Sequence, residues 1–197
     1  MRRLILAFAC LSTAAVAVST GAPAPNFTLT DATGKQVSLA DYKGKTVVLE
    51  WNNPGCPFVQ KHYNSGNMQK TQAAARAQGV VWLSINSGAP GQQGYMVGPE
   101  AVSFVAKQKA SPTDYLLDPR GNVGHLYDAK TTPHMYVVSA AGKLVYQGAI
   151  DDKPTANPAD IASANNLVLA ALADVKAARP VAKPESRAYG CSVKYAS

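Results

Sequence analysis

The sequence predicts an α/β domain in which a mixed central sheet is flanked by helices, with an N-terminal β-hairpin extension and an extended C-terminal tail. Three observations lead to this fold class. Short apolar, β-branched runs alternate with helical patterns, and a final pair of apolar runs around a glycine turn closes the alternation as a hairpin. The 197 residues are 47% hydrophobic and 16% charged, as in one globular domain.

The first residues have the pattern of a secretory signal peptide. Two arginines precede an apolar run that extends to residue 18, and residues 15–17 form a small-residue cleavage pattern. We therefore predict a signal peptide over 1–21 and export to the periplasm or the extracellular space. The alternative is a lipoprotein with Cys10 as the lipidated residue, but the apolar stretch before Cys10 is short. The predicted domain is then 22–178, and the tail is 179–197.

Removal of the signal peptide changes the charge and the cysteine count. The net charge falls from +7 to +5, because Arg2 and Arg3 leave. The remaining charges are scattered, so neither a nucleic-acid partner nor a membrane partner is expected for the mature chain. Of the three cysteines, Cys10 is lost with the signal peptide, and Cys56 and Cys191 remain. In an oxidising compartment such a pair predicts a disulfide, at least part of the time.

The first half of the domain predicts strands followed by two helical segments. Two short strands are expected around a D-A-T-G turn, before the apolar run Thr46–Trp51. That run is typical of a strand buried on both faces. A helix should begin near Pro57, since proline is tolerated in a first helical turn. Residues 64–67 should stop or kink this helix, with Asn67 capping a second segment.

The second half continues the alternation and ends in the tail. The expected elements are a buried strand at 79–85, a helix at 99–109, a strand at 114–118, a short helix after it, a β-hairpin over 134–150 and one long amphipathic helix within 158–178. From Arg179 onward the chain contains prolines and should be extended.

Cys56 is the leading candidate for a reactive residue. It follows a buried strand and precedes a helix, where unpaired N–H groups and the helix dipole favour a thiolate. Pro54 and Gly55 shape a tight turn, and Pro57 presets the backbone of the first helical residue. A buried, inert cysteine is the alternative.

A second candidate feature is the stretch "TTPHMYVV". Pro133 stands directly before a strand, where either a cis or an ordinary trans proline is tolerated. A cis Thr132–Pro133 bond would turn the Thr132 backbone groups outward, where an extended substrate could pair with them. Thr132, Pro133, Trp51 and Pro57 are therefore the predicted substrate-binding residues.

Taken with the order of the elements, these motifs resemble the thioredoxin-like fold. The stretches "VVLEWNNPGCPF" and "TTPHMYVVSAAGKLVYQGAIDD" are similar to its redoxin and peroxiredoxin-like branch, the alkyl-hydroperoxide-reductase/thiol-specific-antioxidant superfamily. The tail motif "GCSVKY" resembles a Gly-Cys-Ser motif that ends one subgroup. The resemblance covers about residues 22–195. It implies that Cys56 is the attacking cysteine of a C-x-x-C site and that Pro133 is the cis-proline facing it.

The sequence departs from the family pattern in two places. Val59 occupies the position of the second cysteine, so the short-range resolving thiol is missing. Asn53 and Leu49 stand where a peroxiredoxin carries its Thr or Ser and its Pro. No arginine lies nearby in sequence, although Arg76 or Arg120 could approach in space. Peroxidase activity by the usual geometry is therefore not favoured.

The predicted function is that of an exported thiol–disulfide oxidoreductase without a cofactor. The Cys56 thiolate would attack a disulfide, and Cys191 would resolve the intermediate if the tail folds back across the domain. A static Cys56–Cys191 disulfide is the alternative for this pair. A peroxiredoxin-like thiol peroxidase with an antioxidant role and a peroxide substrate is the alternative function. In both cases an external reductant is the partner.

Two further functions use the same region. His62 and His134 could tune the thiol, but each is more simply a packed or solvated side chain. Together with Cys56 and Met135 they are ligand types suited to copper, so a metal-handling module is an alternative. The C-x-x-x-C pattern of such modules is absent, and no metal is predicted. The last alternative is a redox-inert binding module shaped by the glycine-rich loop 88–98.

Overall fold

A computed structural model describes residues 18–196 and contains a mixed seven-stranded sheet with strand order β2-β1-β5-β4-β3-β7-β8. The strands are β1 (Thr28–Asp31), β2 (Gln36–Ser38), β3 (Val47–Trp51), β4 (Val81–Asn86), β5 (Asp114–Leu117), β7 (His134–Val138) and β8 (Leu144–Gly148). Strands β3, β4 and β5 are mutually parallel, and the other pairings are antiparallel. The predicted mixed sheet and its N-terminal hairpin are confirmed.

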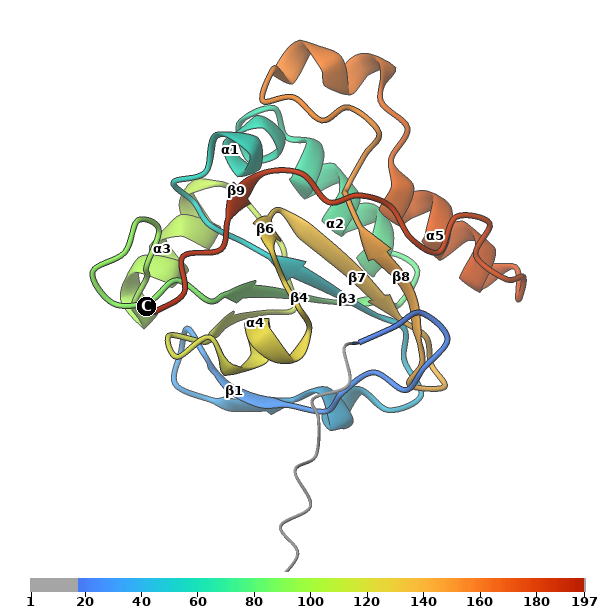
Figure 1. Ribbon diagram of the computed structural model, residues 1–197, viewed down its shortest axis with the longest axis horizontal. Coiled ribbons are helices and arrows are strands. Elements are labelled where there is room, and N and C mark those ends of the chain that lie inside the picture. Colours follow the sequence, from blue (N-terminus) through green and yellow to red (C-terminus); the bar gives the residue numbers. More distant parts are fainter. Residues whose placement is uncertain (1–17, 197) are drawn as a thin grey trace, which may run out of the picture.

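Helices cover both faces of this sheet (Figure 1). They are α1 (Pro57–Asn64), α2 (Asn67–Arg76), α3 (Gly98–Lys107), α4 (Asn122–Leu126) and α5 (Leu167–Lys176), with 3₁₀ turns at Leu39–Tyr42 and Pro158–Ser163. In Figure 1, α1, α2 and α5 lie on one side of the central strands and α4 on the other. The thioredoxin-like α/β architecture predicted from the sequence is confirmed.

Alternating side chains of the central strands build the two cores. Val48 and Trp82 point toward the cluster under α1, α2 and α5, whereas Leu49 and Leu83 belong to the cluster on the α4 side. All five residues of β3 are buried, since both faces of this central strand are covered.

Glu50 is the charged exception inside the first of these cores. Its carboxylate is fully buried and accepts hydrogen bonds from five side chains, those of Asn52, Tyr63, Gln72, Trp82 and Ser84. These donors come from α1, α2, β4 and the end of β3. Because a buried carboxylate needs such donors, Glu50 ties both helices to the sheet.

Two predicted helix features are wrong. The single long helix expected within 158–178 is interrupted, because Asn166 adopts an extended backbone and its side chain accepts a hydrogen bond from the Leu169 N–H. Asn166 is therefore the N-cap of a new helix. At α2 the N-cap is Gly66 in the left-handed region, and Asn67 is already the first helical residue.

The C-terminal tail folds back across the domain, a course that the sequence analysis left open. It leaves α5 and passes in front of the central strands in the view of Figure 1, where it is drawn in red. Glu185 pairs with Gln147 of β8. Further along, β9 (Cys191–Ser192) pairs antiparallel with β6 (Thr131–Thr132) as a separate two-stranded sheet. The tail is thus a packed strap over the ends of the strands.

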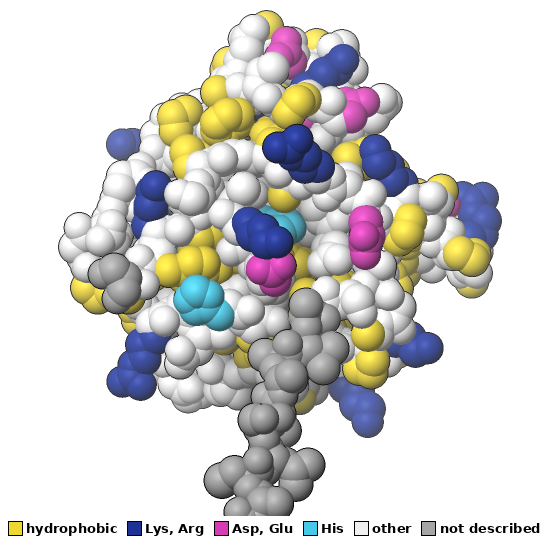
Figure 2. All heavy atoms as spheres, in the orientation of Figure 1, with side chains coloured by type: hydrophobic (Ala, Val, Ile, Leu, Met, Phe, Trp, Pro, Cys, Tyr) yellow, Lys and Arg dark blue, Asp and Glu magenta, His cyan; other side chains and the backbone are white. Residues whose placement is uncertain are grey.

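The predicted signal peptide lies mostly outside the described residues, which begin at residue 18. Within the described part, Gly21 donates to the Leu144 carbonyl oxygen at 2.7 Å, so the chain before the predicted boundary at residue 22 already contacts β8. In residues 18–196 no helix has the length and apolar character that a membrane crossing needs. Lys and Arg side chains are spread singly over the face shown in Figure 2 rather than gathered into a patch.

Candidate functional site

Cys56 occupies the N-cap of α1 and is fully buried. The turn before it is set by Asn53, whose side-chain oxygen accepts from the Gly55 N–H at 2.9 Å and whose carbonyl oxygen accepts from the Cys56 N–H at 3.0 Å. Pro57 follows as the first helical residue and is exposed. The sulfur therefore sits at the positive end of α1, where a thiolate is stabilised.

Cys191 lies directly against this sulfur. The two Sγ atoms are 2.7 Å apart, although 135 positions separate the residues in sequence. The Thr132 carbonyl oxygen lies 3.1 Å from Cys56 Sγ, and the Thr132–Pro133 peptide bond is cis. The structure thus brings together Cys56, Cys191, Thr132 and Pro133, and the two sulfurs are within reach of a disulfide after a small approach.

The strand pairing that seats Cys191 corrects one expectation about Thr132. Its backbone was expected to be open to an extended substrate, but Thr132 pairs with Cys191 itself. The tail therefore fills the position that was assigned to a substrate strand.

Gly190 makes this close approach possible, and the sequence analysis did not single it out. A Cβ at Gly190 would lie 2.0 Å from the Thr132 carbonyl oxygen, and its φ is +144°, where side-chain-bearing residues are strained. Its position in the "GCS" motif is the only sequence signal for it.

The two thiols have opposite electrostatic surroundings. Burial acts to raise the pKa of Cys56, but hydrogen bonds from the Cys191 thiol and the Val59 N–H outweigh it, so the pKa lies below its ordinary value. Burial, together with the hydrogen bond and the charge of Cys56, raises the pKa of Cys191 to about 11. Cys56 is therefore the more acidic thiol of the pair, as an attacking or leaving sulfur should be.

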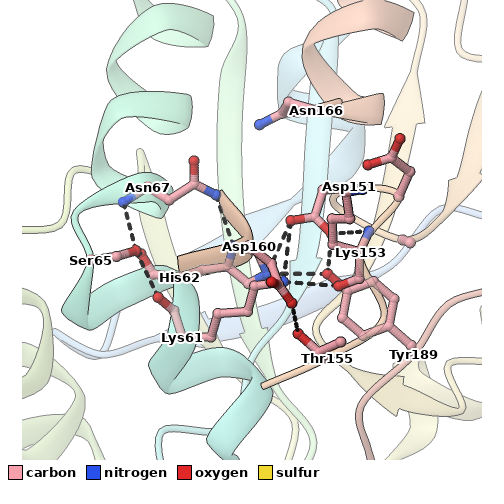
Figure 3. A network of polar contacts seen from close by, with 12 residues as sticks. Lys61, His62, Ser65, Asn67, Asp151, Lys153, Thr155, Asp160, Asn166 and Tyr189 are labelled. Carbon is pink, nitrogen blue, oxygen red and sulfur yellow. Dashed lines mark hydrogen bonds and ion pairs between the residues drawn. The ribbon is translucent and has the colours of Figure 1, made fainter. Parts of the chain in front are cut away.

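A buried ionic cluster anchors the tail one residue before Gly190. Lys61 is 1% exposed, and its Nζ lies 3.5 Å from Asp151 Oδ2 and donates to the Lys153 carbonyl oxygen at 2.9 Å (Figure 3). The Tyr189 hydroxyl donates to Asp151 Oδ1. The cluster links α1 to the tail. A lysine within an amphipathic helix offers no sequence signal that it is buried.

His62 and His134 are buried, and their hydrogen-bond and ring contacts are with residues other than the two cysteines. His62 Nδ1 lies 2.8 Å from the Asn67 amide nitrogen, and the His134 ring packs against Tyr136. The pKa of each is lowered to about 4, chiefly by burial; at His62 the charge of Asp151 opposes this shift and that of Lys61 supports it. Both rings are therefore neutral in the folded protein at neutral pH.

This pair of histidines predicts acid sensitivity. In the unfolded chain a histidine protonates near pH 6.5, so between about pH 6.5 and about pH 4 the unfolded state binds more protons than the folded one. The contribution of the two histidines to the free energy of unfolding should be fully present above about pH 6.5 and fall as the pH drops toward about 4. Urea unfolding at several pH values measures this. A flat profile from about pH 7 to 4.5 would contradict the prediction.

Trp51 does not have the predicted substrate-binding placement. It is fully buried, its Nε1 donates to Ser87 Oγ at 3.0 Å, and its ring packs against Tyr127 and Tyr136. A side chain enclosed in this way offers no surface to a substrate, so its role is packing. Pro57, by contrast, is exposed beside Cys56, and its substrate-binding role stays a prediction.

The donor set considered for copper is not gathered. Within residues 18–196 no group of three or more His, Cys, Asp or Glu side chains is placed to hold a metal ion. The two arginines considered for a peroxide site are both exposed, and Arg76 donates to the Ser111 carbonyl oxygen.

Comparison with protein families identifies the family to which the chain belongs. The family model described as the AhpC/TSA family matches residues 20–147, more than half of the chain. The protein belongs to the AhpC/TSA family.

Individual relatives of this AhpC/TSA protein are of two kinds. The thiol-disulfide oxidoreductase ResA of Bacillus subtilis (strain 168) is 29% identical over 130 residues, which cover 65% of this chain and 66% of that protein. The chloroplastic peroxiredoxin Q of Triticum aestivum is 29% identical over 138 residues, covering 61% and 64%. This chain thus spans just under two thirds of the length of either relative.

The fold likeness extends further along the chain than these sequence matches. A crystal structure of an uncharacterized conserved protein from Geobacillus kaustophilus superimposes with a TM-score of 0.76 at 27% identity. That alignment covers 90% of this chain and 93% of the other.

Proposed function

We propose that this protein is an exported thiol–disulfide oxidoreductase whose redox couple is Cys56 and Cys191. The observation that carries the proposal is the 2.7 Å separation of the two sulfurs. Cys191 thereby provides the second thiol that the C-x-x-C position occupied by Val59 lacks. The AhpC/TSA family membership and the similarity to a thiol-disulfide oxidoreductase support this activity. The N-terminal signal pattern supports export.

The reaction cycles the pair between a dithiol and a disulfide. In the reduced state the Cys56 and Cys191 thiols hold two electrons that pass to an external disulfide, which leaves as two thiols. The Cys56–Cys191 bond that forms is then reduced by an external thiol reductant. Thr132 contributes by pairing with Cys191, which holds that sulfur against Cys56.

Turnover assays with single-cysteine variants test the proposal. Wild type should catalyse reduction of insulin disulfides by dithiothreitol, and Cys56→Ser should fall to the uncatalysed rate. Cys191→Ser should lose the intramolecular disulfide, which mass spectrometry measures. A wild-type protein whose cysteines remain reduced thiols across a full range of glutathione redox buffers would overturn the proposal.

A thiol peroxidase is the second candidate, and one observation favours it. Thr132 Oγ1 is buried and has no hydrogen-bond partner in the described part of the chain, on the residue whose carbonyl oxygen is 3.1 Å from the Cys56 sulfur. This hydroxyl could polarise a peroxide in place of the missing hydroxyl at Asn53. Peroxide consumption coupled to a thiol reductant tests this candidate, and Thr132→Val should abolish any activity found.

A further inference from the structure

The two sulfurs of the proposed redox couple differ in how far solvent reaches them. Cys56 is fully buried, whereas Cys191 is partly exposed. Cys56 lies under Cys191 and the Thr132 carbonyl oxygen, so an external thiol meets Cys191 first unless the tail moves away.

The tail is tied down on both sides of Cys191. Before it, Ser186 Oγ accepts from the Ala149 N–H at 2.9 Å and lies 2.7 Å from the Tyr146 hydroxyl. After it, the Val193 N–H donates to the Lys130 carbonyl oxygen at 3.1 Å, and the Tyr195 hydroxyl donates to the Ala129 carbonyl oxygen at 2.7 Å. Uncovering Cys56 would break these contacts together, so attack at Cys191 is the less costly route.

A hollow of about 540 Å³ opens beside Cys191, large enough for a peptide-sized ligand. Its lining includes Gly190, which precedes Cys191, and Thr131 of β6, which pairs with Ser192, so a ligand there would lie next to the strand pairing that carries the partly exposed Cys191. The lining also includes two exposed cations, Lys183 and Arg187, and one exposed carboxylate, Asp152. The fourth charge, Asp151, is buried and already faces Lys61.

We infer that external thiols exchange with the disulfide pair at Cys191. The hollow binds a short peptide that carries the thiol and has more carboxylates than ammonium groups. This inference rests on the proposed function. The excess of exposed cations over exposed carboxylates gives the lining a net positive charge, which complements such a ligand.

The exchange balances in two steps. The external thiolate attacks Cys191 Sγ, the Cys56–Cys191 bond breaks, and Cys56 leaves as a thiolate, which is the better leaving group because its pKa is the lower of the two. A second external thiolate then attacks the external sulfur of the mixed disulfide. The products are an external disulfide and a Cys191 thiolate that takes a proton from water. Two electrons pass from the external thiols to the protein.

Trapping the mixed disulfide tests the site of attack. Oxidised protein is mixed with reduced glutathione, quenched with acid at early times, alkylated and mapped by mass spectrometry. Glutathione on Cys191 with an alkylated Cys56 is the expected result. Glutathione on Cys56, or equally on both, overturns the inference. A protein that forms no Cys56–Cys191 disulfide at all would instead show that the proposed function has failed.

Charge reversal tests the hollow. Lys183→Glu/Arg187→Glu should slow reduction by glutathione about tenfold at low salt and less at high salt, because exposed charges are screened. Reduction by cysteamine, compared per thiolate, should not slow, since that thiol is cationic. Lys43→Glu/Lys45→Glu, which makes the same change in net charge at exposed residues outside the hollow, should react like wild type. If reduction by glutathione slowed equally in both double variants, or in neither, the proposal that the hollow binds the thiol would be overturned.

Discussion

Replacing Gly190 with alanine should lower the equilibrium constant for the Cys56–Cys191 disulfide at least tenfold. The new Cβ would lie 2.0 Å from the Thr132 carbonyl oxygen, so the strand that carries Cys191 must move away by about an ångström or more to restore ordinary contact. Disulfide geometry tolerates little displacement of its Cα atoms. Titration in glutathione redox buffers, with alkylation of the free thiols, measures the equilibrium constant.

A second glycine separates the clash from backbone strain. Gly79 also has a positive φ, +76°, but no atom lies within 4 Å of where its Cβ would be. Gly79→Ala should destabilise the protein modestly and leave the disulfide equilibrium unchanged. If Gly190→Ala retained the wild-type equilibrium, the close pairing of Cys191 with Thr132 would not govern disulfide formation.

Replacing Lys61 with methionine should lower the free energy of unfolding by about 3 kcal/mol, because it leaves the Asp151 carboxylate buried without its cation. Lys61 and Asp151 are 1% and 2% exposed, so solvent cannot take over this role. Urea unfolding monitored by tryptophan fluorescence measures the loss. The double variant Lys61→Met/Asp151→Asn should be less destabilised than the sum of its single changes, because the unpaired charge is gone.

An exposed ion pair provides the matched control. Lys130 lies 2.9 Å from Asp128, but these side chains are 73% and 55% exposed, so water screens the pair. Lys130→Met should cost less than about 1 kcal/mol. A Lys61→Met variant that unfolds within 0.5 kcal/mol of wild type would contradict the view that the cluster is a stabilising anchor.

Local patterns predicted the elements that depend on neighbours in sequence. The apolar run that became β3 is buried throughout, and the position of Cys56 before Pro57 marked the start of α1. A cis bond before Pro133 was one of two options that the sequence left open, and the structure has it. Where a local rule failed, another local group competed: Asn166 ended the predicted long helix by capping a new one.

Local sequence patterns therefore predicted the thioredoxin-like α/β class and the candidate nucleophile. If the predicted signal peptide is removed, they also leave Cys191 as its one cysteine partner. Tertiary structure decided which sulfur is covered, which backbone Cys191 pairs with, and that Lys61 and Asp151 are buried under the tail. The physical reason is distance along the chain. Periodicity and capping act within a few residues, whereas the contact between Cys56 and Cys191 spans 135 positions and arises only when the tail packs onto the folded sheet.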